Sequence, residues 1–375
     1  WEIREMELPR TVREAVLARL QELPAEAMGL VELVAILGGP APFAFLRALT
    51  PLPEEELLEN LELLVGRDLL TEETNEAGTI VYDFRQIVIR EAVLSEFGMA
   101  RSRVLHSKVA RTLEEHLGAR APAHAGTLAY HYLQAGKEGA SPAAINYLAL
   151  AGRDALRRFG NAEAARYLDA ALKLLDGHPN GIEGESALEG GRIGLLRDLA
   201  RALGRLGRYG EALPLWEEIV AAAKDSGMEE AAAGARLRMG IIKAARGDLQ
   251  DALSEFDEIL STVPDQVPPV TMARTRLRRG IALEELGRSE AASAELEEVM
   301  TLAQELDDPV LLAQAHRALV LLHIWTGHPD RVREHAERAM ELSKSSGASS
   351  VEFWSYVGLA VMEGRTLAIG SFRTK

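Results

Sequence analysis

The chain has 375 residues, no cysteine, and 57 acidic against 42 basic residues, which give it a net charge of −15 at pH 7. Without cysteine it has no disulfide, thiolate metal site or cysteine nucleophile, and no apolar run reaches the ~18 residues of a membrane span. The absence of cysteine and of a signal-peptide pattern suits a cytoplasmic protein, and 375 residues are enough for two domains. The acidic balance disfavours nonspecific binding to nucleic acids or anionic lipids, so we expect the chain to bind neither nucleic acid nor membrane.

Residues 1–117 are expected to form the first domain, which begins with helices. Apolar residues at helical spacing predict helices over residues 11–23 and 25–37, and a short helix after Pro42. A fourth helix is predicted to begin at Glu54, because negative charges in the first turn complement the helix dipole. Strong helix formers dominate the whole chain, so composition also predicts a mainly α-helical fold.

One β-hairpin is predicted later in this domain. Residues 67–73 and 78–84 are the strand candidates, and a turn-rich linker separates them. Two further helices, over residues 85–97 and 100–117, lead into the second domain. Helices with a single small hairpin predict a winged-helix fold.

The charge of the predicted winged helix argues against DNA recognition. The helix before the hairpin would enter a DNA groove, yet it carries the carboxylates of Glu54, Glu55, Glu56, Glu59 and Glu62. These carboxylates would repel the phosphates of DNA. We therefore interpret the domain as a packing and coupling module.

Residues 118–375 are predicted to form an array of helical repeats. Four glycines stand 40 residues apart, and each ends one amphipathic segment and opens a second: Gly207, Gly247, Gly287 and Gly327. Seven residues before each glycine the chain has Ala200, Gly240, Gly280 and Val320. Nine residues after it stand Trp216, Phe256, Leu296 and Ala336. Small residues where two helices cross closely, beside a bulky residue that fills the gap, are typical of helix-turn-helix repeats.

The pattern resembles tetratricopeptide repeats, whose unit is normally about 34 residues, so the longer period here implies longer helices or turns. Residues 147–175 match a further unit, residues 126–134 begin another, and residues 351–361 look like one more first helix. We expect a right-handed α-solenoid of about five or six helix pairs. A solenoid normally closes with a polar capping helix, so the last pair is expected to be truncated by a cut inside a longer protein.

Four phrases in the chain, residues 8–20, 54–70, 82–94 and 101–114, resemble the segment after the nucleotide-binding core of bacterial STAND-class signal-transduction ATPases. The class includes LuxR-type and maltose-regulator-like transcription regulators and ATPase-linked nucleotidyl cyclases. The resemblance implies a sensor region that controls an ATPase and effector outside this chain. Gln86 and Val93 stand where the family usually has histidine and tyrosine, which puts a switch role of that segment in doubt.

No catalytic site, metal site or cofactor site is predicted in this chain. It lacks a Gly-x-x-x-x-Gly-Lys-Ser/Thr loop, so ATP is expected only for an upstream domain. His316 and His323 are seven residues apart, which is too far along one helix for a shared metal. Two alternatives stay open: a constitutive adaptor without ATP control, and an enzyme whose site is assembled from distant repeats.

The resemblance to tetratricopeptide repeats implies a groove lined by the first helix of each unit. Its arginines and tryptophan would anchor a protein or peptide partner, or a small-molecule inducer, and an acidic or amphipathic peptide fits best. For Leu237, Ile241, Leu277 and Ile281, packing inside the array is an equal alternative. The candidate binding residues are Arg197, Arg201, Arg205, Leu237, Ile241, Arg274, Leu277, Ile281, Arg317, Leu321 and Trp325.

Overall fold

A computed structural model describes residues 10–76, 78–177, 190–262 and 266–346, together with Ser355, Val357 and Leu359. The chain divides into two compact units, residues 1–202 and 203–375, and the division falls inside helix α10 (Gly191–Arg205). This division follows contacts between helices and not the start of the repeats, so the predicted boundary between residues 117 and 118 stays a prediction. None of the described helices has the length and apolarity needed to cross a bilayer.

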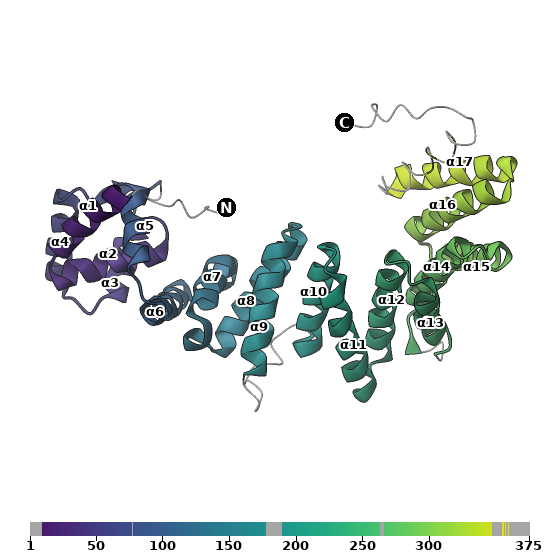
Figure 1. The fold of residues 1–375 in the computed structure, drawn as a ribbon, viewed down its shortest axis with the longest axis horizontal. Coiled ribbons are helices and arrows are strands. Elements are labelled where there is room, and N and C mark those ends of the chain that lie inside the picture. The colour runs from purple at the N-terminus through teal and green to yellow at the C-terminus, as the bar shows by residue number, and fades with distance from the viewer. Residues whose placement is uncertain are drawn as a thin grey trace. The chain divides into compact units, whose positions relative to one another are not determined.

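The beginning of unit 1 contains the predicted helices and hairpin (Figure 1). Helix α2 has the bounds predicted from its apolar spacing, and it ends where Gly38 adopts the left-handed φ of 81°. In chain order the elements are α1 (Arg10–Gln21), α2 (Ala25–Leu37), β1 (Ala41–Pro42), α3 (Phe43–Leu49), α4 (Glu54–Gly66), β2 (Leu70–Thr74), β3 (Ile80–Phe84), α5 (Ile87–Ser95) and α6 (Met99–Leu117).

The hairpin belongs to a three-stranded antiparallel sheet with the order β1-β3-β2. In β2 and β3, Leu70 lies opposite Phe84. Strand β2 begins at Leu70, three residues after the predicted start at Arg67. Arg67 ends α4, and Asp68 adopts a φ of 56°, which is not compatible with an extended strand. Strand β1, which pairs Ala41 with Tyr82, was not predicted, because two residues carry no period.

Helix α2 supplies much of the core of this region. It is buried on nearly every side, and its core partners include Leu46, Leu61 and Val93 from three other helices. The one buried acid of α2, Glu32, accepts a hydrogen bond from Arg101 of α6 at 2.5 Å. This ion pair compensates a carboxylate that would otherwise be costly to bury.

Unit 1 continues with helix pairs. Its further elements are η1 (Gly118–His124), α7 (Ala125–Ala135), η2 (Gly136–Gly139), α8 (Pro142–Arg157), α9 (Asn161–Asp176) and the first part of α10. In the α8–α9 pair Gly152 faces Leu168, and seven residues after Gly152 the turn is made by Phe159 with a φ of 61°. The predicted repeat at residues 147–175 therefore has the same internal spacing as the later repeats.

Among residues 203–262 and 266–346, unit 2 contains the end of α10 and seven further helices that pack in sequence (Figure 1). They are α11 (Tyr209–Asp225), α12 (Glu229–Ala245), α13 (Leu249–Leu260), α14 (Pro269–Glu285), α15 (Ser289–Glu305), α16 (Pro309–Thr326) and α17 (Pro329–Ser346). All four predicted turn glycines lie between helices with a left-handed φ, 73° at Gly207, 88° at Gly247, 75° at Gly287 and 74° at Gly327. Glycine adopts this conformation without the penalty that a Cβ brings.

The predicted packing of small against large residues is also present in unit 2. Gly240 of α12 lies against the ring of Phe256 on α13, and Gly280 of α14 lies against Leu296 on α15. Phe256 and Leu296 are fully buried in one core cluster. The helical fold class with repeated helix pairs is thus confirmed. Of the predicted helix over residues 351–361, only Ser355, Val357 and Leu359 are described, and they are helical; the rest lies outside the described residues.

Candidate functional site

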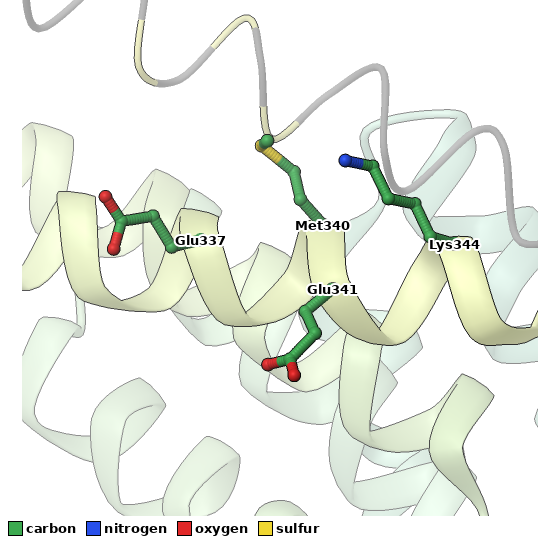
Figure 2. Close-up of a pocket in the computed structure, with 4 residues that line it drawn as sticks. All are labelled: Glu337, Met340, Glu341 and Lys344. Atoms are coloured by element: carbon green, nitrogen blue, oxygen red, sulfur yellow. The ribbon is translucent and has the colours of Figure 1, made fainter.

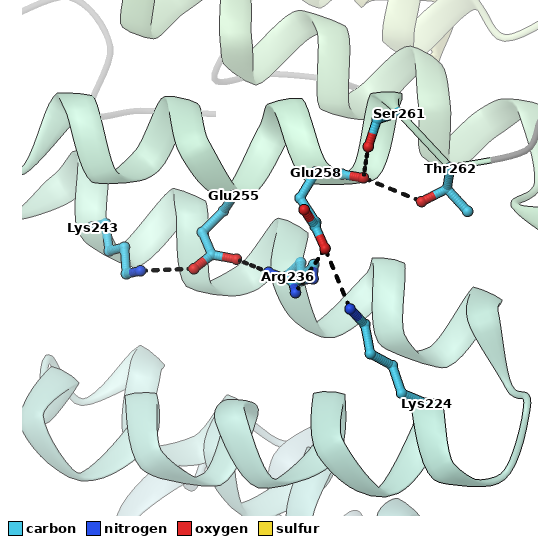
Figure 3. A network of polar contacts seen from close by, with 7 residues as sticks. All are labelled: Lys224, Arg236, Lys243, Glu255, Glu258, Ser261 and Thr262. Carbon is cyan, nitrogen blue, oxygen red and sulfur yellow. Dashed lines mark hydrogen bonds and ion pairs between the residues drawn. The ribbon is translucent and has the colours of Figure 1, made fainter.

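Many charged side chains of unit 2 are used to join its helices. In Figure 3, Arg236 of α12 donates to Glu255 of α13 at 2.7 Å, and Lys243 donates to the other oxygen of Glu255, also at 2.7 Å. Glu258 accepts from Arg236 at 3.2 Å and from Lys224 of α11 at 3.3 Å. Because Glu255 is buried, these partners serve the fold and are not available to a ligand.

Helix α14 continues this network with two of its arginines. Arg279 donates from Nε to Asp257 of α13 and from Nη1 to Glu295 of α15, each at 2.7 Å. Arg276 donates to Glu295 at 3.2 Å. These arginines therefore connect α14 to the helices before and after it.

The other two arginines of α14 have no such role. Arg274 and Arg278 are exposed and make no ion pair with any described residue, and the same holds for half-buried Arg317 on the neighbouring α16. Part of the Arg278 side chain reaches solvent, yet protein atoms crowd its guanidinium group, and this burial together with the positive charge of Arg317 lowers the pKa of Arg278. Burial also lowers the pKa of Arg317. Positive charge gathers here without a described counter-charge.

Residues on this side of α14 and α16 form what we call the arginine face. Along α14 it contains Arg274, Arg278 and Ile281, which lie four and three residues apart and so share one side of a helix. Along α16 it contains Arg317, Leu321 and Trp325, each four residues after the one before, so they too share one side of their helix. Trp325 is 78% exposed, so its indole is free to serve as an aromatic anchor.

Two predicted groove residues lie in the core instead. Leu237 is 9% exposed and Leu277 is 2% exposed, and both belong to the core cluster of unit 2. Leu237 and Leu277 therefore follow the alternative of packing inside the array, because the sides of α12 and α14 that carry them face neighbouring helices. Ile241, Ile281 and Leu321 are half-buried and still present part of their apolar surface. The binding role of the remaining candidates stays a prediction.

The arginine stripe predicted on α10 has an acidic centre in unit 1. Asp198 is 4% exposed and accepts a hydrogen bond from Nε of Arg153 on α8 at 2.9 Å. Exposed Arg197 and Arg201 lie 3.5 and 3.9 Å from the other oxygen of Asp198. One carboxylate thus faces three guanidinium groups, which leaves the site positive. Arg205, also exposed, belongs to unit 2.

Two contributors to these sites were missed in the sequence. Arg153 lies 45 residues before Asp198, so only the packing of α8 with α10 brings them together. Arg278 follows Leu277 directly and is not at a groove position in the tetratricopeptide pattern; its lack of an ion pair depends on the neighbouring helices and is not visible in the sequence. The sequence offers one hint for each site. Asp198 is an acid within an arginine-rich helix, and Arg278 directly follows an expected groove residue.

Buried histidines form two clusters, each inside one unit. His106 of α6 and His131 of α7 share a hydrogen bond between their Nδ1 atoms at 2.9 Å. In unit 2, His316 and His335 do the same at 2.9 Å, and the ring of His323 stacks on His335 with 5.4 Å between centroids. Burial lowers the pKa of His106, His316 and His323 to about 4. These rings are neutral at pH 7, and within the described part of the chain no three metal-ligating side chains converge.

A surface hollow of about 630 Å³ lies along α17 (Figure 2). Its described lining is Glu337, Met340, Glu341 and Lys344, all from that helix, and Met340 and Lys344 point to the same side of it. Binding sites for small molecules normally enclose the ligand with groups from several elements. The hollow is therefore a weaker candidate than the arginine face.

Comparison with known proteins shows a likeness of fold. No protein-family model matches the chain, and no curated protein matches it in sequence. Among solved structures, the apo form of the quorum sensor NprR from B. thuringiensis is 13% identical, with a TM-score of 0.50 over 94% of this chain and 81% of that chain.

Two other solved structures are similar over part or most of the chain. The STAND protein with a tetratricopeptide-repeat sensor from Pyrococcus horikoshii is 13% identical, with a TM-score of 0.41 over 94% of this chain and 56% of that one. BtubC from P. vanneervenii is 17% identical, with a TM-score of 0.46 over 67% of this chain and 93% of that one. At such identities the comparisons concern the fold alone.

Proposed function

We propose that this chain is the sensor region of a bacterial STAND-type signal-transduction ATPase, with a winged-helix domain that couples the repeats to an ATPase core outside the chain. The observation that carries the proposal is the arginine face, whose charged and aromatic groups make no described contribution to folding. Arg274, Arg278 and Arg317 have no described ion pair, and Trp325 is exposed. Arginines without an ion pair beside an exposed tryptophan are typical of a binding surface.

The mechanism follows from the linkage between binding and conformation. The repeats would hold the ATPase core in an inactive arrangement, and a partner or inducer that binds the active arrangement more tightly would shift the population toward it. A tenfold shift requires about 1.4 kcal/mol of difference between the two affinities. ATP binding and the output reaction belong to the domains outside this chain.

The test uses the complete protein encoded by the gene. Its reading frame should contain a nucleotide-binding core upstream of this chain, and deletion of residues 203–375 should raise basal ATP hydrolysis, because the inhibitory contact is removed. The deletion begins at the boundary between the two compact units and removes only the last three residues of α10 from the region that packs in unit 1. A reading frame without a nucleotide-binding core would favour a constitutive adaptor, and unchanged hydrolysis after the deletion would remove the inhibitory role of unit 2.

A further inference from the structure

The arginines of α14 sort into two sides of the helix by their partners. Arg276 and Arg279 are held by Glu295 and Asp257, and they join α14 to α13 and α15. Arg274 and Arg278 stand one helical turn apart on another side and have no described ion pair. Helix α14 thus carries two arginines that form ion pairs with neighbouring helices and two that have no described ion pair.

Arg278 and Arg317 place two like charges close together. They lie on α14 and α16, which pack against one another, and the positive charge of Arg317 reaches Arg278. No described carboxylate lies within ion-pair distance of either guanidinium. Such an arrangement costs folding free energy, because both groups lose part of their hydration and repel each other. A bound anion would remove that cost.

The neighbours of this pair indicate the chemistry of the anion. Half-buried Ile281 and Leu321 lie one turn further along the same two helices, and exposed Trp325 follows Leu321 by another turn. An inorganic anion would gain no favourable contact from this apolar and aromatic surface. A peptide that combines acidic with apolar side chains can contact the guanidinium pair and the apolar surface at once.

We propose that Arg278 and Arg317 together bind a carboxylate of an acidic, amphipathic peptide segment of a protein partner, with Ile281, Leu321 and Trp325 receiving its apolar side chains. This inference rests on the proposed function only in placing the partner on the arginine face. It identifies the partner as a peptide that combines acidic with apolar side chains, held by two planar donors suited to carboxylate geometry.

The first test compares two neighbouring arginines in the intact chain. Arg278→Gln should leave the midpoint of thermal unfolding unchanged or raise it, because it relieves a repulsion. Arg279→Gln, the matched control on the same helix, should lower that midpoint by about 3 °C or more, because it leaves Asp257 without a described ion-pair partner and Glu295 with Arg276 alone. An equal loss of stability in the two variants would make Arg278 a structural residue and overturn the proposal.

The second test measures binding by fluorescence anisotropy at low salt. The probe is a fluorescein-labelled peptide of twelve residues that alternates glutamate and leucine, and a glutamine–leucine peptide is its neutral control. The acidic peptide should bind the wild-type chain. Arg278→Gln and Arg317→Gln should each weaken it about tenfold, whereas Arg279→Gln should change its affinity less than about twofold.

Three outcomes would overturn the proposal: no binding of the acidic peptide to the wild-type chain, equal binding of the neutral peptide, or equal weakening by Arg278→Gln and Arg279→Gln. Inorganic phosphate that binds more tightly than the acidic peptide, and loses affinity in Arg278→Gln, would assign the pair to a phosphate ligand instead. The assay contains no ATPase, so its failure is distinct from a failure of ATPase control.

Discussion

Gly240 on α12 and Phe256 on α13 are so close that a β-carbon on Gly240 would lie 2.8 Å from Cζ of Phe256. The pair lies where the two helices cross, and the ring fills the space that the missing side chain leaves. Phe256 is fully buried there, which stabilises the fold by about 2 kcal/mol. The glycine is thus part of the packing of a ring and not only a tolerated weak helix former.

Gly240→Ala should therefore lower the free energy of unfolding by about 1–3 kcal/mol, because the added methyl group displaces the ring. Adding Phe256→Leu should restore part of the loss, since the equivalent pair Gly280 and Leu296 packs with a smaller side chain. Gly234→Ala on the same helix is the control. Its β-carbon would meet no atom within 4 Å, so it should gain about 1 kcal/mol from helix propensity. Urea denaturation measures all four proteins, and an equal effect of the two alanines would contradict the packing argument.

Phe159 occupies the turn position that glycine holds in the later repeats. Its φ of 61° costs an L-residue about 1–2 kcal/mol, and its side chain is 76% exposed. Phe159→Gly should raise the free energy of unfolding by up to about 1 kcal/mol, because the relief of strain exceeds the extra entropy of glycine in the unfolded chain. The opposite change at the equivalent turn, Gly247→Ala with a φ of 88°, should be destabilising. Thermal unfolding that ranks these two variants the other way would be inconsistent with a strained turn.

The buried histidines predict a loss of stability in mild acid. Burial holds the pKa of His106, His316 and His323 near 4 in the folded chain, below the value of 6.5 for an exposed imidazole. The unfolded chain therefore binds more protons between pH 6.5 and 4, so stability is fully present above pH 6.5 and falls as the pH drops through this window. Each such histidine contributes a slope of about 1.4 kcal/mol per pH unit. Urea midpoints measured from pH 7.5 to 4.5 check the slope.

A substitution isolates one contributor to that slope. Both ring nitrogens of His323 are buried and have no hydrogen-bond partner among the described residues, so His323→Leu removes a buried polar group as well as a titrating one. It should raise stability at pH 5 more than at pH 7.5. Exposed His124→Gln serves as the control, and the same pH dependence in wild type and His323→Leu would exclude His323 as a cause of the acid sensitivity.

Asp198 should matter to stability more than an exposed acid does. Asp198→Ala would remove the buried carboxylate that pairs with Arg153, whose side chain is 16% exposed, which should cost about 3 kcal/mol. The control is Asp154→Ala, since Asp154 is only half-buried and pairs with the exposed Arg157 and Arg158; its loss should be much smaller. Comparable shifts in denaturation midpoint for the two variants would indicate that the buried pair contributes little.

The local features of the fold could be predicted because they depend on neighbours in the chain. Apolar spacing predicted α2 with its observed bounds, and the 40-residue glycine period predicted every turn that carries a left-handed glycine between paired helices of the later repeats. Strand β1 could not be predicted from the sequence, because its two residues are stabilised by pairing with β3, a contact to residues about 40 positions away.

The sequence by itself determined the repeat, its turn positions and the small-to-large packing rule, since glycine conformation and helix periodicity act within one helix pair. Only the tertiary structure decided which charges are used by the fold. Arg276 and Arg279 find carboxylates on neighbouring helices while Arg278 meets Arg317, and Leu277 turns into the core. Electrostatic pairing and burial depend on distances between helices, and no spacing along the chain encodes those distances.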